Sequence, residues 1–152
     1  YEGSPEKAIR TVVDWARGKK VRLIVSLHPF DPPQARQQLR DLYPDVLVYE
    51  GESPPLLAVS DLVLCQHSTV AIEALAFNTP VAEIDLSGTG VLESKSDEGV
   101  AYKITKVSQI DDILSGEMTL DAELLHSWCN KNLGPRDGMA TERAVHEIEA
   151  LV

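Results

Sequence analysis

The chain has 152 residues, of which 43% are hydrophobic and 25% charged, as in an ordinary folded domain. This composition excludes a disordered, collagen-like or disulfide-stapled chain. The 24 acidic and 14 basic side chains give a net charge of −10 at pH 7. Because this charge repels phosphate backbones and anionic lipids, we expect no nucleic-acid or membrane-surface partner. No apolar run approaches the roughly 20 residues that span a bilayer.

The two cysteines, Cys65 and Cys129, are not in a CxxC motif. Cys65 ends an apolar run, where a buried, reduced thiol is the usual outcome, so we expect a cytoplasmic protein. The chain begins at Tyr1 without a signal-peptide pattern. Since no initiator Met precedes the first predicted helix, we expect residues 1–152 to be a single domain excised from a larger, two-domain polypeptide.

Two hydrophobic periodicities alternate along the chain. A Ser4-Pro5 start and apolar residues at helical spacing predict a first helix that closes at Gly18. A nearly continuous apolar run then predicts a buried strand over residues 21–27. The same reasoning predicts further helices over 33–43, 54–59 and 69–77, further strands over 46–49, 61–65, 80–84 and 100–104, and three closing helices.

Strict alternation of strands and helices with short loops predicts right-handed crossovers and parallel strands. We therefore expect an α/β fold: a Rossmann-like, doubly wound parallel sheet of about five strands with helices on both faces. Ligands of such folds bind outside the carboxyl ends of the strands, so the residues that follow each strand are the candidate functional residues.

His28 directly follows the first predicted strand, and the Asp31-Pro32-Pro33 turn comes soon after it. This position would direct the imidazole toward the carboxyl edge of the sheet. The alternative is a strand-ending histidine that is hydrogen-bonded to its own loop. The sequence leaves both interpretations open.

Gln66-His67-Ser68-Thr69 follows the third predicted strand and opens a helix. Ser68 or Thr69 can cap that helix, and the unpaired N–H groups of its first turn, with the positive end of the dipole, can bind a phosphate. The alternative is simple N-capping, which is common in α/β proteins.

Glu73 is the only charged residue between Val70 and Phe77. Burying an unpaired carboxylate costs several kcal/mol, so Glu73 must contact a ligand hydroxyl, contact protein donors, or reach an edge of the fold. We favour a ligand hydroxyl.

Other chemical motifs are missing. Neither GxGxxG nor GxxxxGK[ST] is present, which argues against a standard NAD site and a P-loop, and Gly88-x-Gly90 resembles a phosphate loop only faintly. There is no GxSxG elbow, and adjacency alone does not make His67 and Ser68 a base and nucleophile. His126 and Cys129 are too few ligands for a metal. We predict no metal and no cofactor, and assign no catalytic residue.

Residues 61–81, DLVLCQHSTVAIEALAFNTPV, resemble the donor-site segment in the carboxyl-terminal half of GT-B-fold sugar enzymes. This superfamily includes UDP-N-acetylglucosamine 2-epimerases, bacterial capsule and surface-polysaccharide glycosyltransferases, and CDP-glycerol glycerophosphotransferases. His28-Pro29 is similar to their recurrent strand-end His-Pro. The segment DGMATER, residues 137–143, resembles the DG-x-A-x-x-R ending of the polysaccharide-biosynthesis members.

The resemblance implies that Ser68 and Thr69 hold the diphosphate of a nucleotide sugar, with a pyrimidine base favoured. It also implies that Glu73 binds ribose hydroxyls, that His28 faces the phosphates or the sugar, and that His67 flanks the pocket. Thr69 and Val70 stand where the epimerases have glycines, so the transferase branch fits better.

A complete GT-B enzyme has two such domains, and 152 residues supply one. We therefore expect the donor-binding domain of a glycosyltransferase, inactive without an amino-terminal acceptor-binding domain of the same polypeptide. One alternative is a non-catalytic Rossmann-like regulatory or interaction module, in which Ser68-Thr69 only caps and Glu73 forms a structural ion pair. A second is a small enzyme similar to the UDP-N-acetylglucosamine 2-epimerases.

Overall fold

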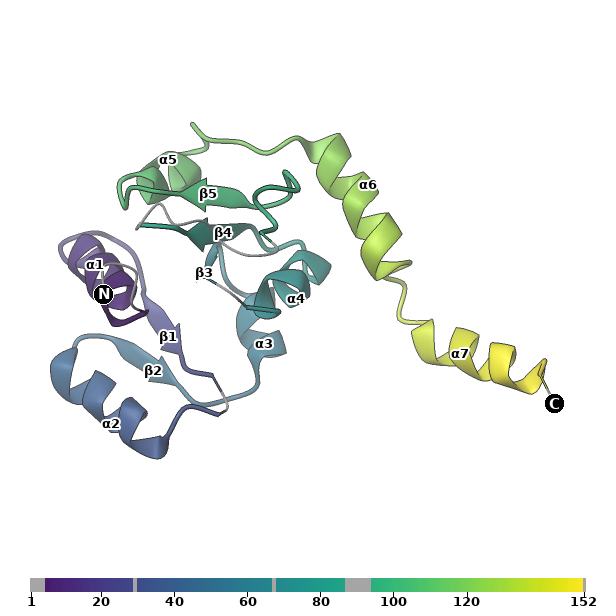
Figure 1. Ribbon diagram of the computed structural model, residues 1–152, viewed down its shortest axis with the longest axis horizontal. Helices are drawn as coiled ribbons and strands as arrows, with labels where there is room; N and C mark the ends of the chain where they lie inside the picture. The colour runs from purple at the N-terminus through teal and green to yellow at the C-terminus, as the bar shows by residue number, and fades with distance from the viewer. Residues whose placement is uncertain (1–4, 29, 67, 87–93, 152) are drawn as a thin grey trace.

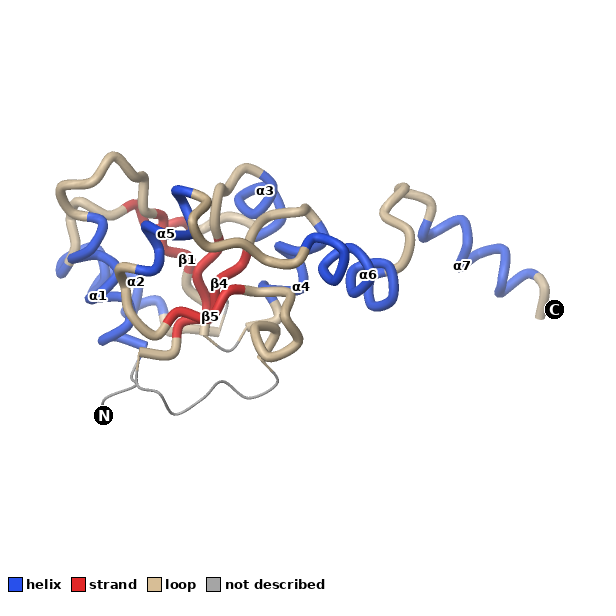
Figure 2. The backbone as a smooth tube through the Cα atoms, turned by 90° about the horizontal axis from the view of Figure 1, so that it is seen from above, coloured by secondary structure: helices blue, strands red, loops and turns tan. Residues whose placement is uncertain are grey.

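The computed structural model describes residues 5–28, 30–66, 68–86 and 94–151, which form an α/β fold (Figures 1 and 2). Its elements are α1 (Pro5–Ala16), β1 (Ile24–Ser26), α2 (Pro33–Leu42), β2 (Leu47–Tyr49), α3 (Ser53–Ala58), β3 (Val63–Cys65), α4 (Val70–Ala76), β4 (Val81–Ile84), β5 (Tyr102–Ile104), α5 (Gln109–Ser115), α6 (Ala122–Leu133) and α7 (Ala140–Glu149). Every element expected from the sequence is present. The strands are shorter than expected because only a few residues of each form ladder pairs.

All the strand pairs in the described residues are parallel, but they form two sheets instead of one. β1 pairs with β2, and Val25 lies opposite Val48. β4 lies between β3 and β5, so that Glu83 has Cys65 on one side and Lys103 on the other. No ladder joins β1 to β3 in this part of the chain, so the single sheet of about five strands is not formed. Periodicity predicts which segments are strands, but it carries no information about which strands pair.

Helices cover both faces of the three-stranded sheet. On one face, α1 and α5 pack against β4 and β5 through a cluster that includes Val12, Ala82, Ile104 and Ile110. On the other face, α3, α4 and α6 pack through a second cluster: Leu57, Ala71, Ala74, Leu75, Val81, Val100, Ala101 and Cys129. β4 is consequently buried along its whole length. This strand is the centre of the fold.

The β1–β2 pair is less covered. α2 packs against β2, with Leu39 and Val48 buried, whereas Leu47 is 54% exposed. Leu23, directly before β1, packs against the cluster of α1 and α5. This pair is therefore attached to the three-stranded sheet by side-chain packing.

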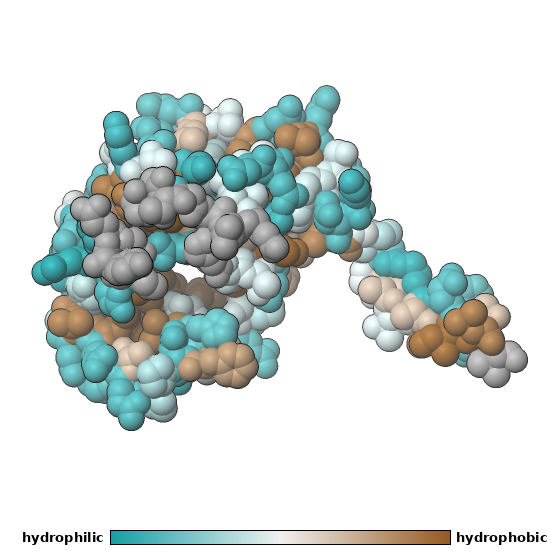
Figure 3. Space-filling model, in the orientation of Figure 1, coloured by the Kyte–Doolittle hydropathy of each residue, from teal (hydrophilic) through white to brown (hydrophobic). Residues whose placement is uncertain are grey.

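The last helix, α7, projects away from the rest of the protein (Figures 1 and 2). None of its residues is buried, and its apolar side chains are exposed, as Figure 3 shows at its far end. The DG-x-A-x-x-R segment, which runs into the first turn of α7, has a structural role: Asp137 accepts a hydrogen bond from the backbone N–H of Met139 and pairs with Arg143, and Gly138 has a φ of +78°. This segment fixes the start of α7.

Candidate functional site

The segment after β3 forms the first part of the candidate site. Ser68 and Thr69 are exposed, and the Ser68 hydroxyl accepts a hydrogen bond from the N–H of Val70 at 3.2 Å. Thr69 occupies the N-cap position but makes no side-chain cap bond. Ser68 is therefore the residue that caps, while the Thr69 hydroxyl faces solvent. His67 lies outside the described residues.

The sequence analysis expected free N–H donors in the first turn of α4, but these N–H groups already have acceptors. Ala71 N–H donates to the Ser68 carbonyl, and the N–H groups of Ile72 and Glu73 donate to the Thr69 carbonyl, with N···O distances of 3.0–3.3 Å. These amides therefore already donate within their own turn, to carbonyl groups of the two residues that precede the helix. A phosphate here would be bound through the hydroxyls of Ser68 and Thr69 first.

Glu73 is exposed, so the argument from its burial was wrong. The core-facing residues of α4 are Ala71, Ala74 and Leu75, and Glu73 falls on the opposite side of the helix, one turn after Thr69. The sequence argument relied on the lack of polar neighbours at helical spacing around Glu73, but that side of α4 faces solvent although Ala76 and Phe77 on it are apolar. Because Glu73 is exposed, its carboxylate is accessible to a ligand that donates hydrogen bonds.

His28 is exposed and forms a compact turn with its own loop. Its backbone N–H donates to Asp31 Oδ2 at 2.8 Å, and its ring nitrogen Nδ1 accepts from Phe30 N–H at 3.2 Å. Because Nδ1 uses its lone pair here, the neutral ring carries its proton on Nε2. The structure therefore shows the interpretation in which the histidine is bound to its own loop. A role for Nε2–H as a donor to a ligand stays a prediction.

Among the predicted residues that the structure describes, Ser68, Thr69 and Glu73 lie together on one turn. His28 follows a strand of the other sheet, and its recorded contacts are confined to residues 28–31. The expected proximity of His28 to Ser68 depended on one continuous sheet, which is not formed. The Gly88-x-Gly90 segment lies outside the described residues.

A buried carboxylate that the sequence analysis missed lies in β4. Glu83 is 3% exposed and accepts hydrogen bonds from the Ser94 hydroxyl and from the N–H groups of Lys95 and Ser96. Burial by itself would raise the pKa of Glu83, but the bonds from Ser94, Ser96 and Lys95 together outweigh it and hold the pKa below its ordinary value. Glu83 thus anchors residues 94–96 to the central strand.

The signal for Glu83 was present in the sequence. It is the only charged residue between Thr79 and Ile84, and its neighbours predict a buried strand. The sequence analysis expected a lone charge in an apolar run to need a partner and applied this to Glu73. The expectation holds for Glu83 instead.

Cys65, beside Glu83 in the sheet, is not a reactive thiol. Burial, with a smaller contribution from the Glu83 charge, raises the pKa of Cys65 to about 12. Both cysteines are free, as expected. In the described part of the chain, no group of three His, Cys, Asp or Glu side chains could hold a metal ion. The exposed His126 contacts Asn130 while Cys129 is buried, so these two residues do not form a metal-binding pair.

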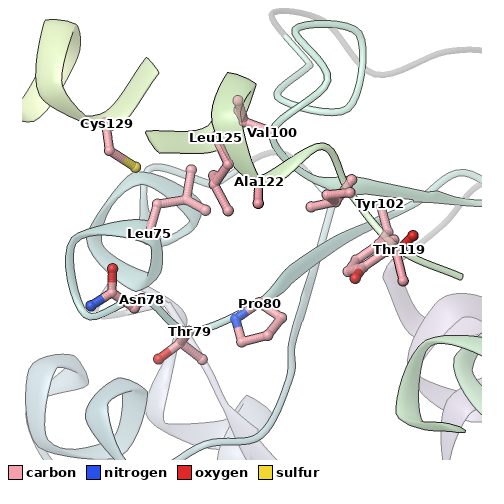
Figure 4. Close-up of a pocket in the computed structure, with 11 residues that line it drawn as sticks. Leu75, Asn78, Thr79, Pro80, Val100, Tyr102, Thr119, Ala122, Leu125 and Cys129 are labelled. Atoms are coloured by element: carbon pink, nitrogen blue, oxygen red, sulfur yellow. The ribbon is translucent and has the colours of Figure 1, made fainter. Parts of the chain in front are cut away.

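A cavity of about 240 Å³ lies at the opposite, amino end of the three-stranded sheet (Figure 4). It is lined by side chains from the end of α4, the starts of β4 and β5, and α6: Leu75, Asn78, Thr79, Pro80, Val100, Tyr102, Thr119, Leu120, Ala122, Leu125 and Cys129. Two of its polar groups are already engaged: the Thr79 hydroxyl donates to the Leu57 carbonyl, and Asn78 Oδ1 accepts from Arg136. Asn78, Pro80 and Thr119 on its wall are exposed, so the cavity opens to the surface.

Comparisons with protein-family models, curated proteins and solved structures gave no match to this chain. Among the helices described here, none is long and apolar enough to cross a membrane.

Proposed function

We propose that this domain binds the nucleotide diphosphate of an activated sugar, as the donor-binding part of a GT-B-type glycosyltransferase of bacterial surface-polysaccharide synthesis. The observation that supports this most is the first turn of α4, where two hydroxyl groups and one carboxylate face solvent after a parallel strand. Hydroxyl groups donate to phosphate oxygens, and a carboxylate accepts from ribose hydroxyls. The site would thus match the two chemically different halves of a nucleotide diphosphate.

In this proposal Ser68 and Thr69 bind the diphosphate and Glu73 binds the ribose. His28 would donate from Nε2 to a phosphate or the sugar, and His67 would flank the same ligand. A pyrimidine nucleotide is the favoured donor, and no metal or further cofactor is assigned. The acceptor and the catalytic base would belong to an amino-terminal domain of the same cytoplasmic polypeptide, so the isolated domain would transfer no sugar.

We also propose an order for the five strands. The β1–β2 pair would be the outer part of one doubly wound, Rossmann-like unit with the strand order β2-β1-β3-β4-β5, which is a common order for such folds. The packing of Leu23 against the cluster on β4 supports this arrangement. It would bring His28 to the edge that Ser68 occupies.

A second candidate is a non-catalytic interaction module. The first-turn amides of α4 favour it, because they already donate within the turn and leave no free anion-binding N–H among residues 71–73. In that case Ser68 acts only as a cap and Glu73 is a solvated surface charge.

A thermal-shift series with UDP, CDP, CMP, GDP and ADP at millimolar concentration separates the two candidates. A ligand of the native state must raise the melting temperature by mass action. We expect a rise with one pyrimidine nucleotide and a much smaller rise in Glu73→Ala, because a lost charged hydrogen bond weakens binding by about 1–3 kcal/mol. The matched control is Glu117→Ala, an exposed glutamate after α5, which should respond as the unmodified protein does.

The absence of a shift with every nucleotide would contradict the proposed function and favour the interaction module. An equal shift in Glu73→Ala and the unmodified protein would contradict the role of Glu73 and place the nucleotide elsewhere.

A further inference from the structure

We draw no further inference here: the strongest candidate, the exposed apolar face that Val145 and Ile148 form on the projecting helix α7, carries none because nothing in the structure shows what covers it.

Discussion

The two ends of the three-stranded sheet differ in chemistry. At the amino end, mostly apolar side chains from α4, α6 and the starts of β4 and β5 surround a cavity, in which the Thr79 hydroxyl and Asn78 Oδ1 already have partners. Beyond the carboxyl end of β3, Ser68, Thr69 and Glu73 face solvent. The cavity is thus at the other end of the sheet from these exposed polar groups. The cavity is lined mostly by apolar side chains, whereas the candidate site is a row of exposed polar side chains on one helical turn.

The largest expected effect is at the amino end. Leu75 is 3% exposed and belongs both to the cavity wall and to the cluster beneath it, so Leu75→Ala should lower the free energy of unfolding by about 2–5 kcal/mol. Leu124, on the neighbouring helix, is 44% exposed, and Leu124→Ala should cost less than about 1 kcal/mol. Urea unfolding followed by circular dichroism measures both. Equal losses would mean that the amino end is not packed as described.

The next effect is at Glu83, near the carboxyl end of β4. Glu83→Ala leaves the Ser94 hydroxyl and the N–H groups of Lys95 and Ser96 without their acceptor, so the free energy of unfolding should fall by about 1–3 kcal/mol. Glu73→Ala is the matched control, with an expected change below about 0.5 kcal/mol because that side chain is exposed. The same unfolding experiment tests the pair, and a larger loss for Glu73→Ala would reverse our assignment of the two carboxylates.

Glu83 also makes stability depend on pH. Its pKa is lower in the folded than in the unfolded protein, so its contribution is fully present above the unfolded pKa and is lost as pH falls through the folded pKa. Glu83→Gln should therefore be clearly less stable than the unmodified protein at pH 6–7, as the Gln side chain cannot accept all of these bonds. The difference in the free energy of unfolding between the two proteins should become smaller below about pH 4.5, as Glu83 becomes protonated. Unfolding curves between pH 3 and 7 test this, and a constant difference would contradict the low pKa.

The smallest effect concerns the start of α4. Ser68→Ala removes the hydroxyl that accepts from Val70 N–H and should cost about 0.5–1 kcal/mol, as is usual for a lost helix cap. Thr69→Ala should cost less, because Thr69 makes no side-chain cap bond. Thermal unfolding without ligand compares the two variants. A greater loss of stability in Thr69→Ala than in Ser68→Ala would show that Thr69, and not Ser68, caps α4.

The sequence was sufficient for the order of helices and strands, since each depends on local periodicity and on turn residues such as Gly18. It also placed Ser68 and Thr69 correctly at a helix start. The pairing of β1 with β2 alone, and the cavity, depend on contacts between segments far apart in the chain, which no local pattern encodes. Glu73 and Glu83 show a third case. A lone charge in an apolar run is buried only when its own side of the element packs against the core, as all of β4 does and as the Glu73 side of α4 does not.

The most direct test of the central claim is a two-dimensional ¹H–¹⁵N NMR titration of the ¹⁵N-labelled protein with UDP, with CDP in a parallel titration. It reports separately on amides at the two ends of the sheet. We expect saturable shifts of the amides of Ser68, Thr69 and Glu73, and little change at Val100 and Leu125 beside the cavity. Shifts confined to the cavity residues, or none with either nucleotide, would contradict this claim.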